Sequence, residues 1–303
     1  GFVGRHVCEL LNRQGVRVTV PTRRARNARG VQPLPMVDVI EADVFAPSVL
    51  DALLVGCDAV VNLIAVLHGD AARFEHVHVQ LPRLLAASAR ARGVRRVVHV
   101  SALGAAPDAP SMYQRSKAQG ETVLAQMGLD LTLLRPSVIF GPDDQFLNLF
   151  AKLQKTFPLM PLAGAGAQLQ PVWVQDVASA VVECLRSPDT IGKTYECVGP
   201  EVFTLKELVH LSGRYAGVER PVLELPRWVG RLQAWALELA PGEPLMSRDN
   251  LDSLRVDNVA SGMLPTLEAL GITPTSLHAI APTYLGGASP QHTLARYRTQ
   301  ARR

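Results

Sequence analysis

The sequence lacks several features that mark other classes of protein. No uninterrupted apolar run reaches the roughly 20 residues that a membrane-spanning helix needs. The four cysteines show no C-x-x-C spacing, so we expect reduced thiols in a cytoplasmic compartment, mostly as small core residues. Nothing in the spacing of cysteine, histidine and carboxylate residues predicts a metal site. Peripheral attachment to an inner membrane stays open as a second location.

A strong charge of one sign is also missing. The chain has 31 Lys and Arg against 27 Asp and Glu, a formal charge of +4, which gives no reason to expect nucleic-acid binding. The excess gathers in two arginine clusters, which are Arg23, Arg24, Arg26 and Arg29, and the C-terminal Arg296, Arg298, Arg302 and Arg303. We interpret the second cluster as a solvated tail, with binding to an anionic membrane or to nucleic acid as the lesser alternative.

The first half of the chain alternates short β-branched segments with helical ones. This pattern predicts strands at 16–20, 37–40, 59–64, 97–100 and 131–134, and helices at 47–54, 73–92 and 113–127. Repeated β-α-β units form a parallel sheet with right-handed crossovers and helices on both faces. We therefore predict an α/β, doubly wound, Rossmann-type sheet, with binding sites beyond the carboxyl ends of its strands.

The alternation stops after Gly141 and Pro142. Helices are expected at 177–186, 205–213 and 227–240, separated by segments rich in proline and glycine. We predict a dinucleotide-binding domain at 1–142, a smaller and mostly helical substrate lobe with returns to the sheet at 143–290, and a basic tail at 291–303.

The chain begins with glycines three residues apart. Gly1, Phe2, Val3 and Gly4 open a helical segment that leads into the strand at 16–20. They look like the end of a glycine-rich phosphate loop, in which the helix N-terminus holds a pyrophosphate. No strand precedes Gly1, so we expect an N-terminally truncated sequence whose central first strand is missing. The alternative is an ordinary glycine-rich helix start.

Tyr113 and Lys117 form the most informative pair in the sequence. A Tyr-x-x-x-Lys spacing on a helix places both side chains on one face, about one turn apart. A phenol titrates near pH 10, and we expect the neighbouring ammonium to lower that pKa. The pair would then transfer a proton to or from a hydroxyl while hydride leaves or arrives.

Together these motifs resemble the extended branch of the short-chain dehydrogenase/reductase superfamily, the NAD-dependent epimerase/dehydratase family. The motifs follow in the order that the family shows. Gly-x-x-Gly at 1–4 comes first, then Arg-Arg after the strand at 16–20, an Asp after the strand at 37–40, Asn-Leu-Ile-Ala at 62–65, Ser101, and Tyr-x-x-x-Lys at 113–117. The segments 135–142 and 171–178 match the downstream signatures of the branch. Within that branch, the segments 101–105, 113–121, 143–148 and 254–259 resemble the atypical group that contains the nucleotide-binding accessory subunit of respiratory complex I and its bacterial relatives. The resemblance covers nearly the whole chain.

The resemblance implies a role for each matching residue. Tyr113 and Lys117 would be catalytic and would both sit beside the nicotinamide ribose. Ser101 would be a further catalytic candidate. The residues implied in dinucleotide binding are Gly1, Phe2, Val3, Gly4, Arg23, Arg24, Asp43, Val44, Asn62, Ala65, Tyr113, Lys117, Pro136 and Ser137. An arginine at the adenosine ribose can neutralise a 2′-phosphate, so NADP is slightly favoured over NAD. Arg23 and Arg24 as solvated charges, Asp43 as a turn residue, and Asn62 as a partner for backbone groups are the alternatives.

One position departs from the family pattern. A Ser or Thr usually holds the substrate oxygen two positions after the serine at the fifth strand end, and here that position is Leu103. Ser101 and Ser111 lie nearby but not at the expected place. The first hypothesis is therefore an NAD(P)-dependent oxidoreductase or epimerase acting on an unidentified small molecule. The second is a cofactor-binding structural or assembly component, with a respiratory complex or quinone-linked partner.

Two further patterns have more ordinary interpretations. His76 and His78 face different directions on a helix and are expected to be surface or core residues. Trp228, Leu232, Trp235 and Leu239 form one apolar stripe, which we expect to pack in the core of the smaller lobe. A lid, a partner surface or an interfacial membrane contact is the alternative for that stripe.

Overall fold

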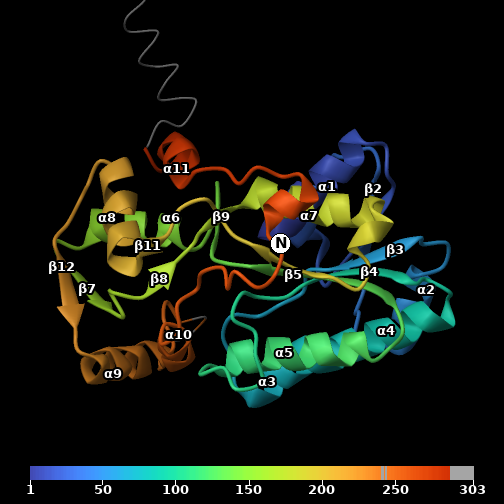
Figure 1. The fold of residues 1–303 in the computed structure, drawn as a ribbon, viewed down its shortest axis with the longest axis horizontal. Coiled ribbons are helices and arrows are strands. Elements are labelled where there is room, and N and C mark those ends of the chain that lie inside the picture. The colour runs from blue at the N-terminus through green and yellow to red at the C-terminus, as the bar shows by residue number, and fades with distance from the viewer. Residues whose placement is uncertain (240–241, 243, 287–303) are drawn as a thin grey trace, which may run out of the picture.

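The computed structural model describes residues 1–239, 242 and 244–286, so the predicted tail at 291–303 lies outside the described residues. A four-stranded parallel sheet in the order β10-β5-β4-β3 forms the centre of the larger lobe (Figure 1). Its strands are β3 (Ala59–Asn62), β4 (Arg96–Val100), β5 (Asp130–Pro136) and β10 (Thr194–Cys197). A second parallel pair, β1 (Val18–Thr22) and β2 (Val37–Glu41), is a separate hydrogen-bonded unit.

Helices cover both faces of the sheet. On one face α1 (Phe2–Arg13) packs against α7 (Val174–Arg186), and on the other α4 (Leu81–Ala91) packs against α5 (Met112–Ala125) (Figure 1). The short α2 (Pro47–Leu53) packs against α4. Val97, Val98, Leu131 and Leu134 in the middle of the sheet are buried because helices cover both of its faces. The predicted α/β fold with a parallel, doubly wound sheet is confirmed.

The second lobe consists of helices and two-stranded ribbons around its own apolar core. Its strands are β6 (Ile139–Phe140), β7 (Met160–Ala163), β8 (Gln168–Leu169), β9 (Val172–Trp173), β11 (Phe203–Thr204) and β12 (Val222–Leu225). Its helices are α6 (Leu147–Thr156), α8 (Leu205–Tyr215), α9 (Arg227–Glu238), α10 (Arg248–Ser253) and α11 (Leu277–Leu285). β10 lies between these elements in sequence but pairs with β5 of the larger lobe.

The helix predicted over 73–92 is interrupted. It consists of α3 (Ala71–Glu75), a π-helical turn η2 (His76–Gln80) and α4. Pro82 has no N–H to donate to the carbonyl of His78 four residues earlier, and the N–H of Leu81 donates to the carbonyl of His76, five residues earlier. The wide turn lies directly against α5, because a Cβ added to Gly120 would be 2.1 Å from the His78 carbonyl oxygen.

The apolar stripe of α9 is exposed, so the prediction of core packing is wrong. Trp228 is 72% exposed, Leu232 57%, Trp235 47% and Leu239 68%. The helix packs instead through its small residues Gly230 and Ala234, which allow close approach to β7. Within the described ranges, no helix is long and apolar enough to cross a membrane.

Candidate functional site

Lys117 is held rigidly where β4 ends. α5 begins at Met112 because the Ser111 hydroxyl accepts the N–H of Gln114, and Lys117 follows one turn into the helix. Its side chain is only 1% exposed, and its Nζ donates to the Val100 carbonyl at 2.8 Å. Burial lowers the pKa of Lys117 to about 8. An ammonium has three N–H donors, so the bond to Val100 leaves donors for a ligand.

Tyr113 is half-buried between aromatic rings. Phe74 and His78 meet it edge-on, with ring centroids 6.2 Å and 5.5 Å away. Burial raises the pKa of Tyr113 to about 12, so the expectation that Lys117 lowers this pKa is wrong. The Lys117 ammonium is bonded to a backbone carbonyl, and removal of the phenol from water favours its neutral form. Tyr113 therefore keeps its proton at neutral pH.

A buried histidine is connected to the backbone of Tyr113 through hydrogen bonds. His78 Nδ1 lies 2.8 Å from the Ser116 hydroxyl, which donates to the Tyr113 carbonyl at 2.8 Å. The N–H of Val66 reaches His78 Nε2 at 3.1 Å. The Ser116 hydroxyl donates its one hydrogen to the Tyr113 carbonyl, so it must accept a hydrogen bond from the Nδ1–H of His78. Since Nε2 of His78 accepts the N–H of Val66, the imidazole is neutral and carries its hydrogen on Nδ1. Burial, with the Lys117 charge as the smaller cause, lowers the pKa of His78 to about 3.

His78 therefore joins the loop after β3 to the helix that carries Tyr113. Sequence reasoning noticed His78 but gave it no role in the site. The signal that could have identified it is Pro82, which lies four residues after His78 and predicts an irregular helical turn at His78 itself.

The second lobe also positions Tyr113. Asp249, in the first turn of α10, accepts the N–H of Met112 at 2.6 Å and that of Tyr113 at 3.0 Å. A carboxylate at a helix N-terminus is favoured by the free N–H groups and by the helix dipole. No local sequence pattern links Asp249 to Tyr113, since they lie 136 residues apart.

The strand ends beside Lys117 carry a mixed set of polar groups. Ser101 follows Val100 directly, is 4% exposed, and its hydroxyl has no hydrogen-bond partner in the described part of the chain. Leu103 is buried, and its N–H donates to the Pro136 carbonyl at 2.9 Å. Ser111 is occupied as the helix cap. The buried Ser101 hydroxyl therefore has hydrogen-bonding capacity to spare, as do the Lys117 ammonium and His99 Nε2.

Ser137 and Asn258 tie the end of β5 to the second lobe. The Ser137 hydroxyl lies 2.5 Å from Asn258 Oδ1, and Asn258 Nδ2 donates to the Leu103 carbonyl at 3.3 Å. This network orders Pro136, Ser137 and Leu103 relative to one another. Asn258 had no assigned role in the sequence prediction.

The predicted pyrophosphate end has the geometry of an open helix N-terminus. α1 begins at Phe2 after Gly1, and no side chain of the described residues caps it. The N–H groups of Phe2, Val3 and Gly4 therefore remain available to an anion, which the helix dipole also favours. Gly4 lies beside the loop after β3, since an added Cβ would be 3.5 Å from Leu63 Cδ1.

The predicted adenosine residues occupy the ends of three strands. Arg23 and Arg24 follow β1, are exposed, and form no ion pair with another described residue. Asp43 accepts the N–H of Phe45 at 3.0 Å, which is the turn role left open above, and Val44 beside it is half-buried.

After β3, Asn62 accepts the N–H of Ile64 at 3.2 Å, and its Nδ2 lies 3.0 Å from His99 Nδ1. Ala65 is exposed in the loop that follows. The ends of β3, β4 and β5 thus bring together Asn62, Ser101 and Pro136, whereas Arg23, Arg24 and Asp43 belong to the separate β1–β2 unit.

These residues fit a dinucleotide. The uncapped N-terminus of α1 suits a pyrophosphate, the remaining donors of Lys117 suit ribose hydroxyls, and the Ser101 hydroxyl can reach a further polar group. Such a cofactor would lie across the carboxyl ends of the strands, as ligands do in open α/β sheets.

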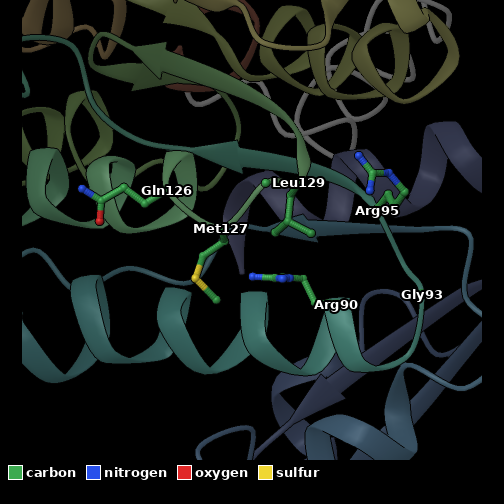
Figure 2. A pocket seen from close by; sticks show the side chains of 7 residues that line it. Arg90, Gly93, Arg95, Gln126, Met127 and Leu129 are labelled. Atoms are coloured by element: carbon green, nitrogen blue, oxygen red, sulfur yellow. The ribbon is translucent and has the colours of Figure 1, made fainter.

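Two cavities lie elsewhere. One of about 360 Å³ is lined by Arg90, Gly93, Arg95, Gln126, Met127, Gly128 and Leu129, at the far ends of α4 and α5 from Tyr113. Figure 2 shows Arg90 and Met127 pointing toward one another there. The other, of about 480 Å³, lies in the second lobe between α9, α10 and the turn after β7. No predicted site residue lines either cavity.

Comparison with known proteins identifies one family and several similar proteins. Residues 1–198 match the NAD dependent epimerase/dehydratase family. The chain is 34% identical over 292 residues to the NADH dehydrogenase (ubiquinone) 1 alpha subcomplex subunit 9, mitochondrial, of Rattus norvegicus, an alignment that covers 91% of this chain and 75% of that protein. It is 28% identical over 228 residues to a ceramide reductase of Caulobacter vibrioides, covering 75% and 71% of the two chains.

Solved structures show the same fold. A dTDP-glucose 4,6-dehydratase of Streptomyces venezuelae with NAD and TYD bound superposes with a TM-score of 0.73 at 21% identity, over 94% of this chain and 93% of that one. The UDP-glucose 4-epimerase of Thermus thermophilus in complex with NAD gives 0.71 at 21% identity, over 95% and 97%. The resemblance recognised in the sequence, including the likeness to a complex I subunit, is confirmed.

Proposed function

The chain belongs to the NAD dependent epimerase/dehydratase family, and from that premise we propose that it is a dinucleotide-dependent oxidoreductase with Tyr113 as its proton donor. The observation that carries the proposal is the position of Lys117, a buried ammonium that donates to the carbonyl of Val100 at the end of β4, one helical turn from Tyr113; Ser101, whose buried hydroxyl has no partner among the described residues, directly follows Val100. Burying a charge is costly, so its retention favours a role in binding.

Different residues around the strand ends would each bind a different part of the cofactor. The N–H groups at Phe2, Val3 and Gly4 would hold the pyrophosphate. Lys117 would hold the nicotinamide ribose, with Pro136 and Ser137 at the nicotinamide ring. Asp43, Val44, Asn62 and Ala65 would border the adenosine. The bound nicotinamide would supply hydride-transfer chemistry.

The pKa of Tyr113 favours one direction of reaction. At neutral pH a phenol with a pKa near 12 is protonated, so Tyr113 can give its proton to a substrate oxygen that gains negative charge. Ser101 would orient that oxygen through its hydroxyl. We therefore propose reduction of a carbonyl compound as the favoured direction at neutral pH.

The test uses the full chain. NADPH and NADH are titrated by fluorescence, and oxidation of each is followed with aldehydes, quinones and UDP-4-keto-sugars. Tyr113→Phe should lower turnover by about 10²- to 10⁴-fold while leaving cofactor affinity nearly unchanged. Tyr195→Phe, at a buried tyrosine in β10, is the matched control and should retain turnover. Equal turnover in the Tyr113→Phe variant would refute the proton-donor role.

We further propose a preference for NADP over NAD. Arg23 and Arg24 are exposed after β1 and without ion-pair partners among the described residues, so both can meet a 2′-phosphate. Arg23→Ala with Arg24→Ala should weaken NADPH binding at least about tenfold and NADH binding little. The control pair is Arg26→Ala with Arg29→Ala on the same loop. Equal weakening of both cofactors would contradict the preference.

A second function is favoured by Leu103. A buried leucine stands at the position where the family pattern has a hydroxyl, and relatives at up to 34% identity are named as complex I subunits. We propose as the alternative a cofactor-binding structural or assembly component of a respiratory complex, in the cytoplasm or at the periphery of the inner membrane. Tight dinucleotide binding without turnover, in both the unmodified chain and Tyr113→Phe, would decide for this alternative.

A further inference from the structure

The helix α9 presents its apolar residues away from the protein body. Trp228, Leu232, Trp235 and Leu239 recur at helical spacing and are all between 47% and 72% exposed. The buried side of the same helix carries Gly230 and Ala234, where a Cβ added to Gly230 would meet that of Ala163 at 2.3 Å. α9 is thus amphipathic in the sense opposite to an ordinary surface helix, whose apolar side faces the core.

Basic side chains border this apolar face. Arg227 and Arg231 lie on α9 itself, and with Arg255 they line the cavity of about 480 Å³ between α9, α10 and the turn after β7. Figure 1 shows α9 and α10 together at the edge of the second lobe.

The acidic groups near these arginines are engaged. Asp252 pairs with Arg231 at 3.0 Å, and Asp257 accepts the N–H of Gln168 at 3.0 Å. Glu238 pairs with Arg248 at 2.8 Å. Arg227 and Arg255 form no ion pair with any described residue, and the three arginines of this cavity lining face two aspartates, Asp252 and Asp257, which leaves one positive charge in excess at this edge of the lobe.

We propose that the α9 face docks this protein on an anionic membrane surface. An interfacial helix combines Trp and Leu on one side with Arg or Lys beside them, and it lies in the plane of the headgroups. α9 has 12 residues and is about 18 Å long, too short to cross a bilayer of roughly 30 Å. Trp228 and Trp235 enter the headgroup layer, while Arg227 and Arg255 meet lipid phosphates.

This inference goes beyond the proposed functions and depends on neither. Vesicle binding requires no cofactor, no substrate and no turnover. A chain that fails to reduce any carbonyl compound would still bind vesicles, and an active enzyme that ignores vesicles would leave the proposed reaction intact.

The experiment is co-sedimentation of the full chain with vesicles, supported by tryptophan emission. Vesicles of phosphatidylcholine alone are compared with an equal mixture of phosphatidylcholine and phosphatidylglycerol. We expect binding to the mixed vesicles, with a blue-shifted emission. Trp228→Ser with Trp235→Ser should lower the partition coefficient at least about tenfold. Arg227→Gln with Arg255→Gln should lower it about fivefold per charge and weaken its dependence on salt.

The control is Val55→Ser with Leu67→Ser, which removes exposed apolar side chains from the larger lobe and should leave partitioning unchanged. Circular dichroism checks that each variant folds. Failure of the unmodified chain to bind mixed vesicles would overturn the proposal, as would undiminished binding by the tryptophan variant. Dimerisation without vesicles that the tryptophan variant abolishes would assign the face to a second copy and also overturn it.

Discussion

The surroundings of α5 and the outer face of α9 depart from the usual distribution of side chains in opposite directions. Around α5, the polar side chains of His78, His99 and Lys117 are at most 2% exposed. On α9 and at its C-terminal end, two tryptophans and two leucines are between 47% and 72% exposed. The same chain thus buries titratable groups in one region and leaves large apolar groups in water in another.

The two departures differ in how they are compensated. Around α5, hydrogen bonds join Val66, His78, Ser116 and the backbone of Tyr113, while Ser101 Oγ and His99 Nε2 keep no partner among the described residues. On α9 the described residues do not cover the apolar side chains. The first region therefore offers a few buried polar atoms to a ligand, whereas the second offers an exposed apolar surface.

Gly120→Ala should have the largest effect on stability, because it places a methyl group in the close contact between α5 and η2. The new Cβ would lie 2.1 Å from the His78 carbonyl oxygen, and η2 would have to move. We expect a loss of about 3 kcal/mol in the free energy of unfolding, measured by urea denaturation. Gly166→Ala, where an added Cβ meets nothing within 4 Å, is the control. Equal stability of both variants would mean that η2 does not press on α5.

His78 should make stability depend on acid pH. Its pKa is about 3 in the folded protein against 6.5 in the unfolded chain, so the unfolded chain takes up the proton first. Stability should therefore fall as pH decreases from 6.5 towards 3, by about 1.4 kcal/mol for each unit of pKa difference. The pKa of His99 is lowered in the same direction, so His78→Asn should make the profile shallower without flattening it.

Urea unfolding at a series of pH values measures this slope. His76→Asn, at an exposed histidine two residues away, should leave the slope as it is. Parallel profiles for the unmodified chain and His78→Asn would show that His78 is not the group that titrates.

The smallest effect is expected on α9. Trp228→Ser should change the free energy of unfolding by less than about 1 kcal/mol, because 72% of that residue already lies in water. Phe140→Ala in the core of the same lobe should cost about 3 to 5 kcal/mol. If the tryptophan variant were as unstable as Phe140→Ala, the stripe of α9 would have to pack inside the protein, and the contrast between α9 and the α5 region would be wrong.

The sheet could be predicted from the sequence because its strands are short, β-branched and separated by helical segments. The strand predicted at 97–100 corresponds to β4, and the helix predicted at 113–127 to α5. The break at 76–80 was missed because Pro82 acts on the carbonyl of His78 in the preceding turn, and a helical pattern over 73–92 hides that effect.

The site was harder to predict where it depends on distant contacts. The Tyr-x-x-x-Lys spacing indicated the helix and its face, but burial sets the pKa of Tyr113, and no local pattern reports burial. Asp249 and Asn258 come from the second lobe and reach the site only after folding. The stripe on α9 was predicted with the right period and the wrong side, because periodicity does not say which way a helix faces.

The carboxylate of Asp249 belongs to one lobe and the helix that it caps belongs to the other. Any rotation between the lobes that separates α10 from α5 must release the N–H groups of Met112 and Tyr113 together. Two ligands that both bind more tightly when this contact is closed would each strengthen the binding of the other by the same factor, because linkage is reciprocal.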